Sequence, residues 1–192
     1  SEGKEIIDLS IGEPDFMTPD AGKFAAKDAI DHNKTKYDMV PGLVPLREEI
    51  AKKLSLENQV NYLPSEIVVS SGAKNAITNA LIATLDPLDE VIIPAPYWTS
   101  YPEMVKLCQG VPIIVQTNAE NDFKLTVKQL EKAITDRTKI VLINNPSNPT
   151  GAVYTRDELE PLVNYCIEHH LLILADEIYE RICYDQPFVS IP

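Results

Sequence analysis

Two hydrophobic patterns alternate along the 192 residues of this chain. Short, nearly continuous runs of Val, Ile and Leu are typical of strands that are buried on both faces of a sheet. Longer runs in which an apolar residue returns every three or four positions are typical of amphipathic helices. The expected strands are residues 67–70, 90–94, 111–116, 139–144 and 171–176. The expected helices are residues 21–32, 44–57, 73–85, 100–109, 127–134 and 156–169.

The alternation of strands and helices predicts an α/β fold, in which helices cover both faces of a mainly parallel central sheet. The apolar runs at residues 140–143 and 171–174 are expected to be central strands. Thr126 and Thr155 each precede a helical run and are expected to cap it. Residues 1–19 are rich in Gly, Pro and Asp and are expected to form an extended N-terminal arm. The remainder, residues 20–192, is expected to belong to this α/β fold.

The composition disfavours a nucleic-acid-binding, a membrane-spanning and a secreted protein. The chain has 17 Lys and Arg against 29 Asp and Glu, a net charge of −12, which disfavours a nucleic-acid partner. The longest apolar runs are shorter than the roughly 20 residues of a membrane span. The N-terminus lacks the apolar stretch of a secretory signal. A cytoplasmic protein with no membrane partner is therefore expected.

The cysteines predict neither a disulfide framework nor a metal site. Cys108, Cys166 and Cys183 are an odd number at unrelated spacings, so reduced thiols are expected. Cys166 with His169 and His170 could be read as metal ligands, but the chain has no second ligand pair at zinc-type spacing. The favoured interpretation of that cluster is the end of a helix.

Polar and aromatic residues follow four of the expected strands, at the points where doubly wound sheets bind ligands. Ser71-Gly72-Ala73-Lys74 is a turn that opens a helix. Free N–H groups and the helix dipole at such a point favour an anion such as phosphate, and a simple capped helix start is an equally good interpretation. Trp98 lies in a proline-rich turn, where a rigid aromatic ring either stacks on a planar ligand or packs against the protein.

Two further turns carry amides and a carboxylate. The octet at residues 144–151 is richer in Asn and Pro than a plain connection needs, which favours a functional loop with amides held in fixed geometry. Asp176 ends an apolar strand, and a carboxylate that is partly desolvated there needs a cation or a hydrogen-bond donor. A ligand cation would supply one. The alternative is an internal ion pair with Arg181 or Lys139.

Taken together, the four turns resemble the cofactor site of the class I and II aminotransferases, the pyridoxal-phosphate (PLP) enzymes that include aspartate aminotransferase. The resemblance covers essentially the whole chain. It implies that residues 20–192 form part of a large three-layer α/β/α domain that is incomplete in this chain. It runs through Asp8-Leu9-Ser10-Ile11-Gly12-Glu13-Pro14-Asp15-Phe16, Lys36-Tyr37, Gly42-Leu43, Leu46-Arg47-Glu48-Glu49-Ile50-Ala51 and Asp176-Glu177-Ile178-Tyr179.

The resemblance implies a role toward PLP for each residue of the set. Asp176 would face the pyridine nitrogen and keep it protonated, and Trp98 would stack on the ring. Asn148 and Tyr179 would hydrogen-bond the ring hydroxyl oxygen. The phosphate would be held by Ser71, Gly72, Ala73 and Lys74 and, from the neighbouring subunit of a homodimer, by Tyr37. The substrate would contact Gly12, Ile11, Trp98 and Asn148.

The implied function of the full-length protein is PLP-dependent transamination between an amino acid, aspartate or a similar one, and a 2-oxoacid. The lysine that forms the Schiff base in this family is expected beyond Pro192, so the chain alone is expected to be inactive. Other PLP enzymes of the same fold, such as β-lyases and acyltransferases, share these ring contacts and stay open as alternatives. A noncatalytic aminotransferase-like binding domain, as in a transcriptional regulator, is the alternative from another class.

Overall fold

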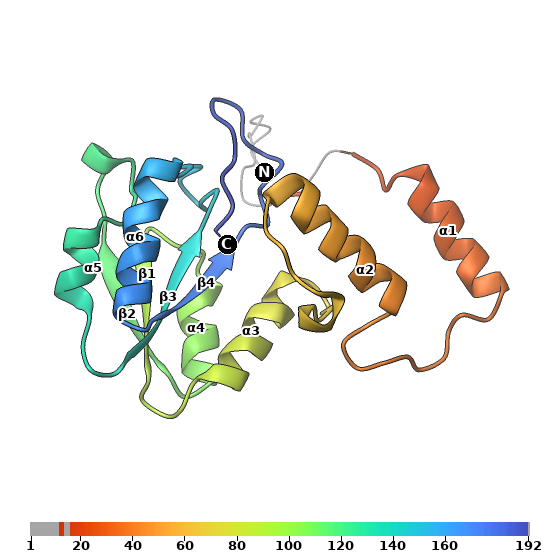
Figure 1. Ribbon diagram of the computed structural model, residues 1–192, viewed down its shortest axis with the longest axis horizontal. Coiled ribbons are helices and arrows are strands. Elements are labelled where there is room, and N and C mark those ends of the chain that lie inside the picture. The colour runs from red at the N-terminus through yellow and green to blue at the C-terminus, as the bar shows by residue number, and fades with distance from the viewer. Residues whose placement is uncertain (1–11, 14–15, 192) are drawn as a thin grey trace, which may run out of the picture. The chain divides into compact units, whose positions relative to one another are not determined.

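The computed structural model describes residues 12–13 and 16–191, which fall into two compact units, Ser1–Met39 and Val40–Pro192 (Figure 1). The arm expected over residues 1–19 lies largely outside the described residues. In the first unit, α1 (Asp20–Asp31) follows Pro19. Its first turn contains Asp20, where the positive end of the helix dipole stabilises a carboxylate. The second unit contains the sheet.

From residue 90 onward, the second unit alternates strands and helices in the order that the hydrophobic pattern predicts. Its strands are β1 (Glu90–Ala95), β2 (Val111–Gln116), β3 (Thr138–Asn144) and β4 (Leu172–Asp176). Its α-helices are α2 (Val44–Lys53), α3 (Ala73–Thr84), α4 (Ser100–Leu107), α5 (Val127–Ala133) and α6 (Arg156–Glu168). A π-helical turn, η1 (Leu54–Asn58), continues α2, and the short 3-10 turns η2 (Pro64–Glu66) and η3 (Ala119–Asn121) precede α3 and α5.

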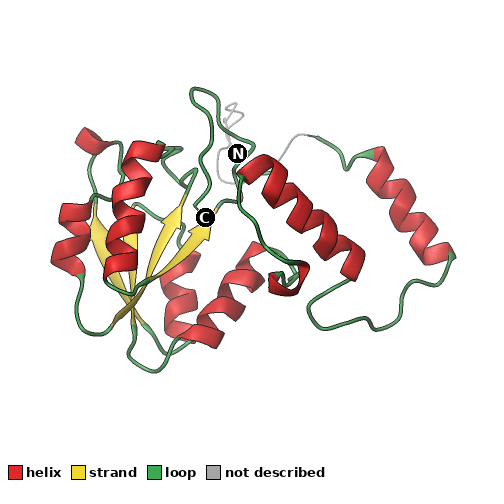
Figure 2. Ribbon diagram, viewed as in Figure 1, coloured by secondary structure: helices red, strands yellow, loops and turns green. Residues whose placement is uncertain are grey.

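The four strands form one parallel sheet in the order β2-β1-β3-β4. Helices α5 and α6 cover one face of the sheet, and α3 and α4 cover the other (Figures 1 and 2). Successive residues of a strand point to opposite faces. Ile92 accordingly packs with α5 and α6, whereas Val91 and Ile93 pack with α3 and α4. The predicted α/β/α architecture with a parallel sheet is therefore confirmed.

Two helix starts carry the residues of the predicted capping pattern. The Thr126 hydroxyl accepts a hydrogen bond from Gln129 N at 3.3 Å, and the Gln129 side chain accepts one from Thr126 N at 3.0 Å. In the same way, Glu158 accepts a hydrogen bond from Thr155 N at 2.7 Å. These bonds satisfy N–H groups at the helix start that have no partner within the helix. The predicted cap by Thr126 is therefore confirmed. At the second helix start, Glu158 bonds the backbone of Thr155, but the Thr155 side chain accepts no hydrogen bond from the helix.

Two details of the predicted sheet are wrong. Residues 67–70 are not a strand of the sheet, because Val69 N donates to Pro41 O, at 2.9 Å, in a loop that is not itself a strand. The run at 171–174 was expected to be central, but β4 lies at the edge of the described sheet and Leu172 is 48% exposed. An apolar run indicates that both faces of a strand are hydrophobic, but it does not determine which strands lie beside it.

The strand order places a topological switch point between β1 and β3. The connection after β1 leads through α4 to β2, and the connection after β3 leads through α6 to β4, in the opposite direction. Because parallel crossovers are right-handed, these opposite directions put α4 and α6 on opposite faces of the sheet. The loops after β1 and β3 therefore diverge at the carboxyl edge, which is where open α/β sheets bind ligands.

Candidate cofactor site

Residues from three turns of the second unit meet at the carboxyl edge of the sheet. Lys74 Nζ, at the start of α3, lies 4.8 Å from the centroid of the Trp98 ring. The rings of Trp98 and Tyr101 meet edge to face, with their centroids 5.4 Å apart. The Tyr101 hydroxyl donates to Asp176 Oδ2 at 2.7 Å. Contacts between side chains thus connect the start of α3, the turn after β1 and the end of β4.

Asp176 is a buried acid, 7% exposed, at the end of β4. Its Oδ2 accepts the hydrogen bond from the Tyr101 hydroxyl, and its Oδ1 accepts one from Ile178 N at 3.2 Å. A carboxylate offers about four lone pairs. Asp176 therefore keeps the capacity to accept a hydrogen bond from a further donor.

Neither of the two cations considered as internal partners of Asp176 contacts it. Lys139 Nζ lies 2.9 Å from Asp89 Oδ2 and 3.6 Å from Asp86 Oδ2. Arg181 pairs with Glu57. The ion-pair interpretation of Asp176 is therefore wrong, because hydrogen bonds from uncharged donors stabilise this carboxylate.

Tyr101 is a site residue that the sequence did not single out. Tyr101 N donates to Trp98 O at 3.0 Å, and this tight turn brings the two rings together. Burial, together with the hydrogen bond to Asp176, raises the pKa of the Tyr101 hydroxyl above its ordinary value. The hydroxyl therefore stays protonated at neutral pH and remains a donor to the carboxylate. Its position three residues after the predicted Trp98 was the only local signal.

Asn144 is a second residue that sequence analysis did not assign to the site. It pairs with Asp176 in the ladder between β3 and β4. Its Nδ2 donates to Asp176 O at 3.0 Å, and its Oδ1 accepts from Asn148 N at 2.7 Å. One amide therefore fixes the end of β4 and the backbone of the turn that carries Asn148. The Asn-rich composition of residues 144–151 was the signal.

The turn before α3 leaves backbone N–H groups free to bind an anion. Gly72 precedes the helix with φ 85° and ψ 166°, a conformation that is essentially restricted to Gly, and no side chain caps the helix. The hydrogen bond from Ala76 N to Gly72 O, at 3.1 Å, begins the regular pattern of the helix. The amides of Ala73 and Lys74 precede that bond and have no acceptor within the helix. This geometry supports the interpretation of the turn as an anion site.

Trp98 packs against the core and is still partly accessible to a ligand. It is half-buried and packs against the core cluster that includes residues of α3 and α4. The ammonium group of Lys74 lies over its ring, an arrangement that the ring quadrupole favours. A planar ligand would stack on the ring face that Lys74 leaves free, or would displace Lys74. Packing and ligand stacking are therefore compatible roles for this side chain.

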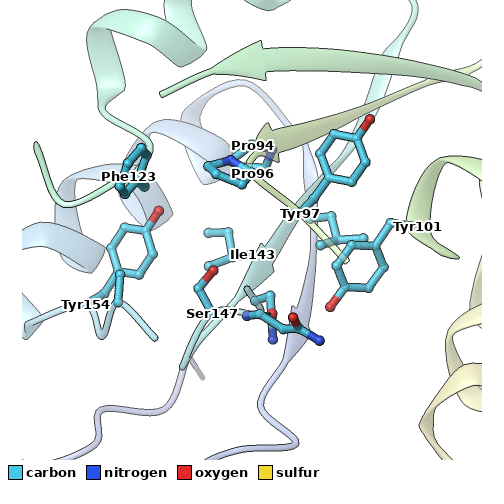
Figure 3. Close-up of a pocket in the computed structure, with 12 residues that line it drawn as sticks. Pro94, Pro96, Tyr97, Tyr101, Phe123, Ile143, Ser147 and Tyr154 are labelled. Carbon is cyan, nitrogen blue, oxygen red and sulfur yellow. Dashed lines mark hydrogen bonds between the residues drawn. The ribbon is translucent and has the colours of Figure 1, made fainter. Parts of the chain in front are cut away.

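A pocket opens at the same edge of the sheet, at the topological switch point (Figure 3). Its lining includes Pro94 near the end of β1, with Pro96 and Tyr97 after that strand. It also includes Asn144 at the end of β3, with Ser147 and Asn148 after that strand. Figure 3 shows the rings of Phe123 and Tyr154 on one side of the pocket and those of Tyr97 and Tyr101 on the other. Burial raises the pKa of Tyr154 to about 12, so this hydroxyl also stays protonated. The pocket is walled by aromatic rings and carries amide and hydroxyl groups.

For the remaining predicted site residues, the structure gives fewer contacts with the rest of the site. Tyr179 lies near enough to Tyr101 to contribute to the rise of its pKa. Ser71 N donates to Asn75 Oδ1 at 3.3 Å. Gly12 and Tyr37 belong to the first unit, and Ile11 lies outside the described residues. The cofactor and substrate contacts expected for these residues stay predictions.

The structure gives a plain account of the cysteine and histidine cluster. Helix α6 ends here, Cys166 is buried in the core, and the His169 ring stacks on Tyr165 with centroids 4.2 Å apart. Burial raises the pKa of Cys166 to about 11, so its thiol stays protonated. Among the residues that the structure describes, no group of three or more His, Cys, Asp or Glu side chains is placed to hold a metal ion. In the same described ranges, no helix has the length and apolar character of a membrane span.

The chain matches known proteins along almost its whole length. The model of the family "Aminotransferase class I and II" matches residues 4–191. The chain is 50% identical over 184 residues to an aspartate/prephenate aminotransferase of Cereibacter sphaeroides. The aligned region covers 95% of this chain and 46% of that protein. It is 47% identical over 185 residues to an aspartate aminotransferase of a Bacillus species, which covers 96% of this chain and 47% of that protein.

A solved structure agrees with these relatives. The aspartate aminotransferase of Rhizobium meliloti superposes with a TM-score of 0.94 at 47% identity, which covers 98% of this chain and 48% of that one. The chain therefore belongs to the class I and II aminotransferase family. It spans about half the length of the relatives that it matches.

Family membership implies PLP as the cofactor, and the residues present fit that group in two respects. The start of α3, which no side chain caps, suits a phosphate. Asp176 can accept a further hydrogen bond and suits a protonated ring nitrogen. The two features are joined through Lys74, Trp98 and Tyr101.

Proposed function

We propose that the whole protein is a PLP-dependent aminotransferase that moves an amino group between aspartate, or a similar amino acid, and a 2-oxoacid. One observation carries this proposal: the buried carboxylate of Asp176 is connected, through contacts between side chains, to the N-terminus of α3, which no side chain caps. A pyridine ring with a phosphate arm needs both partners. The names of the relatives support aspartate as the amino donor.

PLP, when bound, supplies a pyridine ring that takes up the electron pair left on the substrate when the α-proton is removed. Asp176 would hold a proton on the ring nitrogen, because a carboxylate stabilises a protonated neighbour. Tyr101 would keep Asp176 in place through its hydrogen bond. Asn148 and Tyr179 would donate hydrogen bonds to the ring oxygen. Trp98 would exclude water from one face of the ring.

Replacement of Gly72 by Ala is expected to raise the dissociation constant of the whole protein for PLP about tenfold. A Cβ at this position meets no atom within 4 Å, so the effect comes from the backbone, because Ala disfavours φ +85°. Relaxation of the turn would move the Ala73 and Lys74 amides away from the phosphate. Titration of the apo protein with PLP, followed by absorbance, measures the change.

The matched control for this variant is Gly22→Ala. Gly22 lies within α1, where an added Cβ also meets no atom within 4 Å, and its φ is ordinary. This replacement is expected to leave PLP binding unchanged. Equal PLP affinity of the Gly72→Ala variant and the unmodified protein would refute the phosphate role of the turn before α3.

The direct test of the proposed function is an assay of the whole protein with aspartate as amino donor and 2-oxoglutarate as acceptor. Formation of oxaloacetate is expected, and prephenate is a second acceptor to compare, because one relative carries that substrate in its name. Absence of turnover with any amino donor would sink the transaminase proposal. A β-lyase would instead release ammonia without an acceptor. A noncatalytic binding domain would bind PLP without turnover.

The proposal extends to the assembly of the whole protein. In the proposed assembly, residues 1–19 would be an arm and residues 20–192 a part of the large domain. The whole protein would be a cytoplasmic homodimer in which Tyr37 of one subunit would reach the phosphate bound by the other. The Schiff-base lysine would lie outside residues 1–192, and these residues alone are then expected not to transaminate. Borohydride reduction of the PLP-loaded whole protein, followed by peptide mapping, identifies that lysine, and sedimentation measures the oligomeric state.

A further inference from the structure

The turn after β4 is tied to the end of α2 by a triangle of polar side chains, Lys53, Asn58 and Glu180. Lys53 Nζ lies 2.6 Å from the Glu180 carboxylate and donates to Asn58 Oδ1 at 2.7 Å. Asn58 Nδ2 donates to Glu180 Oε2 at 2.9 Å. Each member therefore contacts both of the others. The side chains of Lys53 and Glu180 are only 33% and 21% exposed.

The π-helical turn η1 makes this triangle possible. Lys53 and Asn58 are five residues apart, and in a regular α-helix such residues point about 140° away from each other. The i→i+5 bonding of a π-helix widens the turn and brings the two side chains together. Gln59, with φ 60°, then ends the helix. Single π-turns of this kind are frequent at functional sites.

The triangle holds one end of the turn that carries Tyr179. Within the turn, Glu180 N donates to Glu177 O at 3.0 Å and Ile182 N donates to Tyr179 O at 2.7 Å. At the other end, the Glu177 carboxylate accepts from Ser190 Oγ at 2.6 Å and from Ile191 N at 2.8 Å. Tyr179 therefore lies between two anchored carboxylates, Glu177 and Glu180.

We infer that the triangle of Lys53, Asn58 and Glu180 positions Tyr179, so that its hydroxyl is directed to the ring oxygen of the cofactor. This inference rests on the proposed function, because it needs PLP at the site. Glu180 is a positioning residue that acts through its neighbour in the chain. Burial alone would raise the pKa of Glu180, but hydrogen bonds from Asn58 and Lys53 hold it below its usual value, so the carboxylate stays charged.

The test is Lys53→Met in the PLP-loaded whole protein, with the pH midpoint of the visible cofactor absorbance as the readout. A hydrogen bond from Tyr179 to the ring oxygen stabilises the deprotonated form of the cofactor and lowers this midpoint. Weakening that bond is expected to raise the midpoint by about half a pH unit. Glu180→Gln, which removes the charge and keeps the size, is expected to have the same effect and replaces Lys53→Met if that variant does not fold.

Lys139→Met is the matched control, because it removes a similar ion pair near the start of β3, at the amino edge of the sheet and away from the site. The side chains of Lys139 and Asp89 are 36% and 23% exposed, and their charged atoms lie 2.9 Å apart. This variant is expected to leave the midpoint unchanged. A shift of the midpoint that came only from lower stability of the protein would appear in both lysine variants.

A double-mutant cycle with Tyr179→Phe separates positioning from a general effect. In the Tyr179→Phe background, Lys53→Met is expected to cause no further shift of the midpoint, because the hydroxyl on which it acts is gone. A midpoint unchanged by Lys53→Met, or a shift that persists in the Phe background, overturns the inference alone. Absence of any cofactor absorbance in the unmodified protein overturns the proposed function together with it.

Discussion

Replacement of Asp176 by Asn is expected to lower kcat/KM of the whole protein about a thousandfold. Asn has the same shape and keeps an oxygen for the hydrogen bond from Tyr101, but it carries no charge. A neutral amide no longer holds a proton on the ring nitrogen of PLP, so the ring withdraws electrons less strongly. We expect kcat and kcat/KM to fall together, because the lost interaction is strongest in the transition state.

Steady-state kinetics with aspartate and 2-oxoglutarate measure this loss, and titration with PLP checks that the variant still binds the cofactor. Asp89→Asn is the control, because Asp89 is also a partly buried acid but pairs with Lys139 at the amino edge of the sheet. That variant is expected to keep nearly full activity. If Asp176→Asn retained a tenth or more of the activity, the assignment of this carboxylate to the ring nitrogen would be wrong.

Elements whose hydrophobic spacing decides their structure were predictable from the sequence. A helix was expected at residues 73–85, and α3 spans Ala73–Thr84. Ile77 and Leu81 are four residues apart, so they lie on one face of the helix, and both are buried in the core. The run at 140–143 was correctly expected to be a buried central strand, because a parallel sheet between two helical layers buries both faces of its inner strands.

Contacts between distant segments were not predictable from local patterns. Tyr101 and Asp176 are 75 positions apart, and Asn144 and Asp176 are 32 apart. The choice between a hydroxyl and a cation as the partner of Asp176 depends on which helix covers the end of β4, and spacing alone does not determine this. Residues 67–70 show the same limit, because a β-rich run becomes a strand only where another strand lies beside it.

Asn145 gives the Asn-rich turn a structural function in addition to the proposed cofactor contact. It is fully buried, directly after β3. Its Nδ2 donates to Val189 O at 3.1 Å, and its Oδ1 accepts from Tyr154 N at 3.0 Å. Its backbone N donates to Asp176 O at 3.0 Å. One residue thus joins the loop after β3, the segment before α6 and the chain beyond the turn that carries Tyr179.

Replacement of Asn145 by Ala is expected to lower the free energy of unfolding of the whole protein by about 3 kcal/mol. The change leaves Val189 O and Tyr154 N without their partners and creates a small cavity. Urea unfolding followed by circular dichroism measures the difference through the transition midpoint, provided that the slope with urea stays the same.

Asn121→Ala separates the effect of burial from the loss of any asparagine. Asn121 is exposed and makes one side-chain hydrogen bond, from Nδ2 to Lys124 O at 3.0 Å. Water can replace that partner, so this variant is expected to lose less than about 1 kcal/mol. Equal losses in the two variants would mean that water also reaches the groups around Asn145, and the end of β3 would then be anchored by its ladder to β4 and by Asn144 instead.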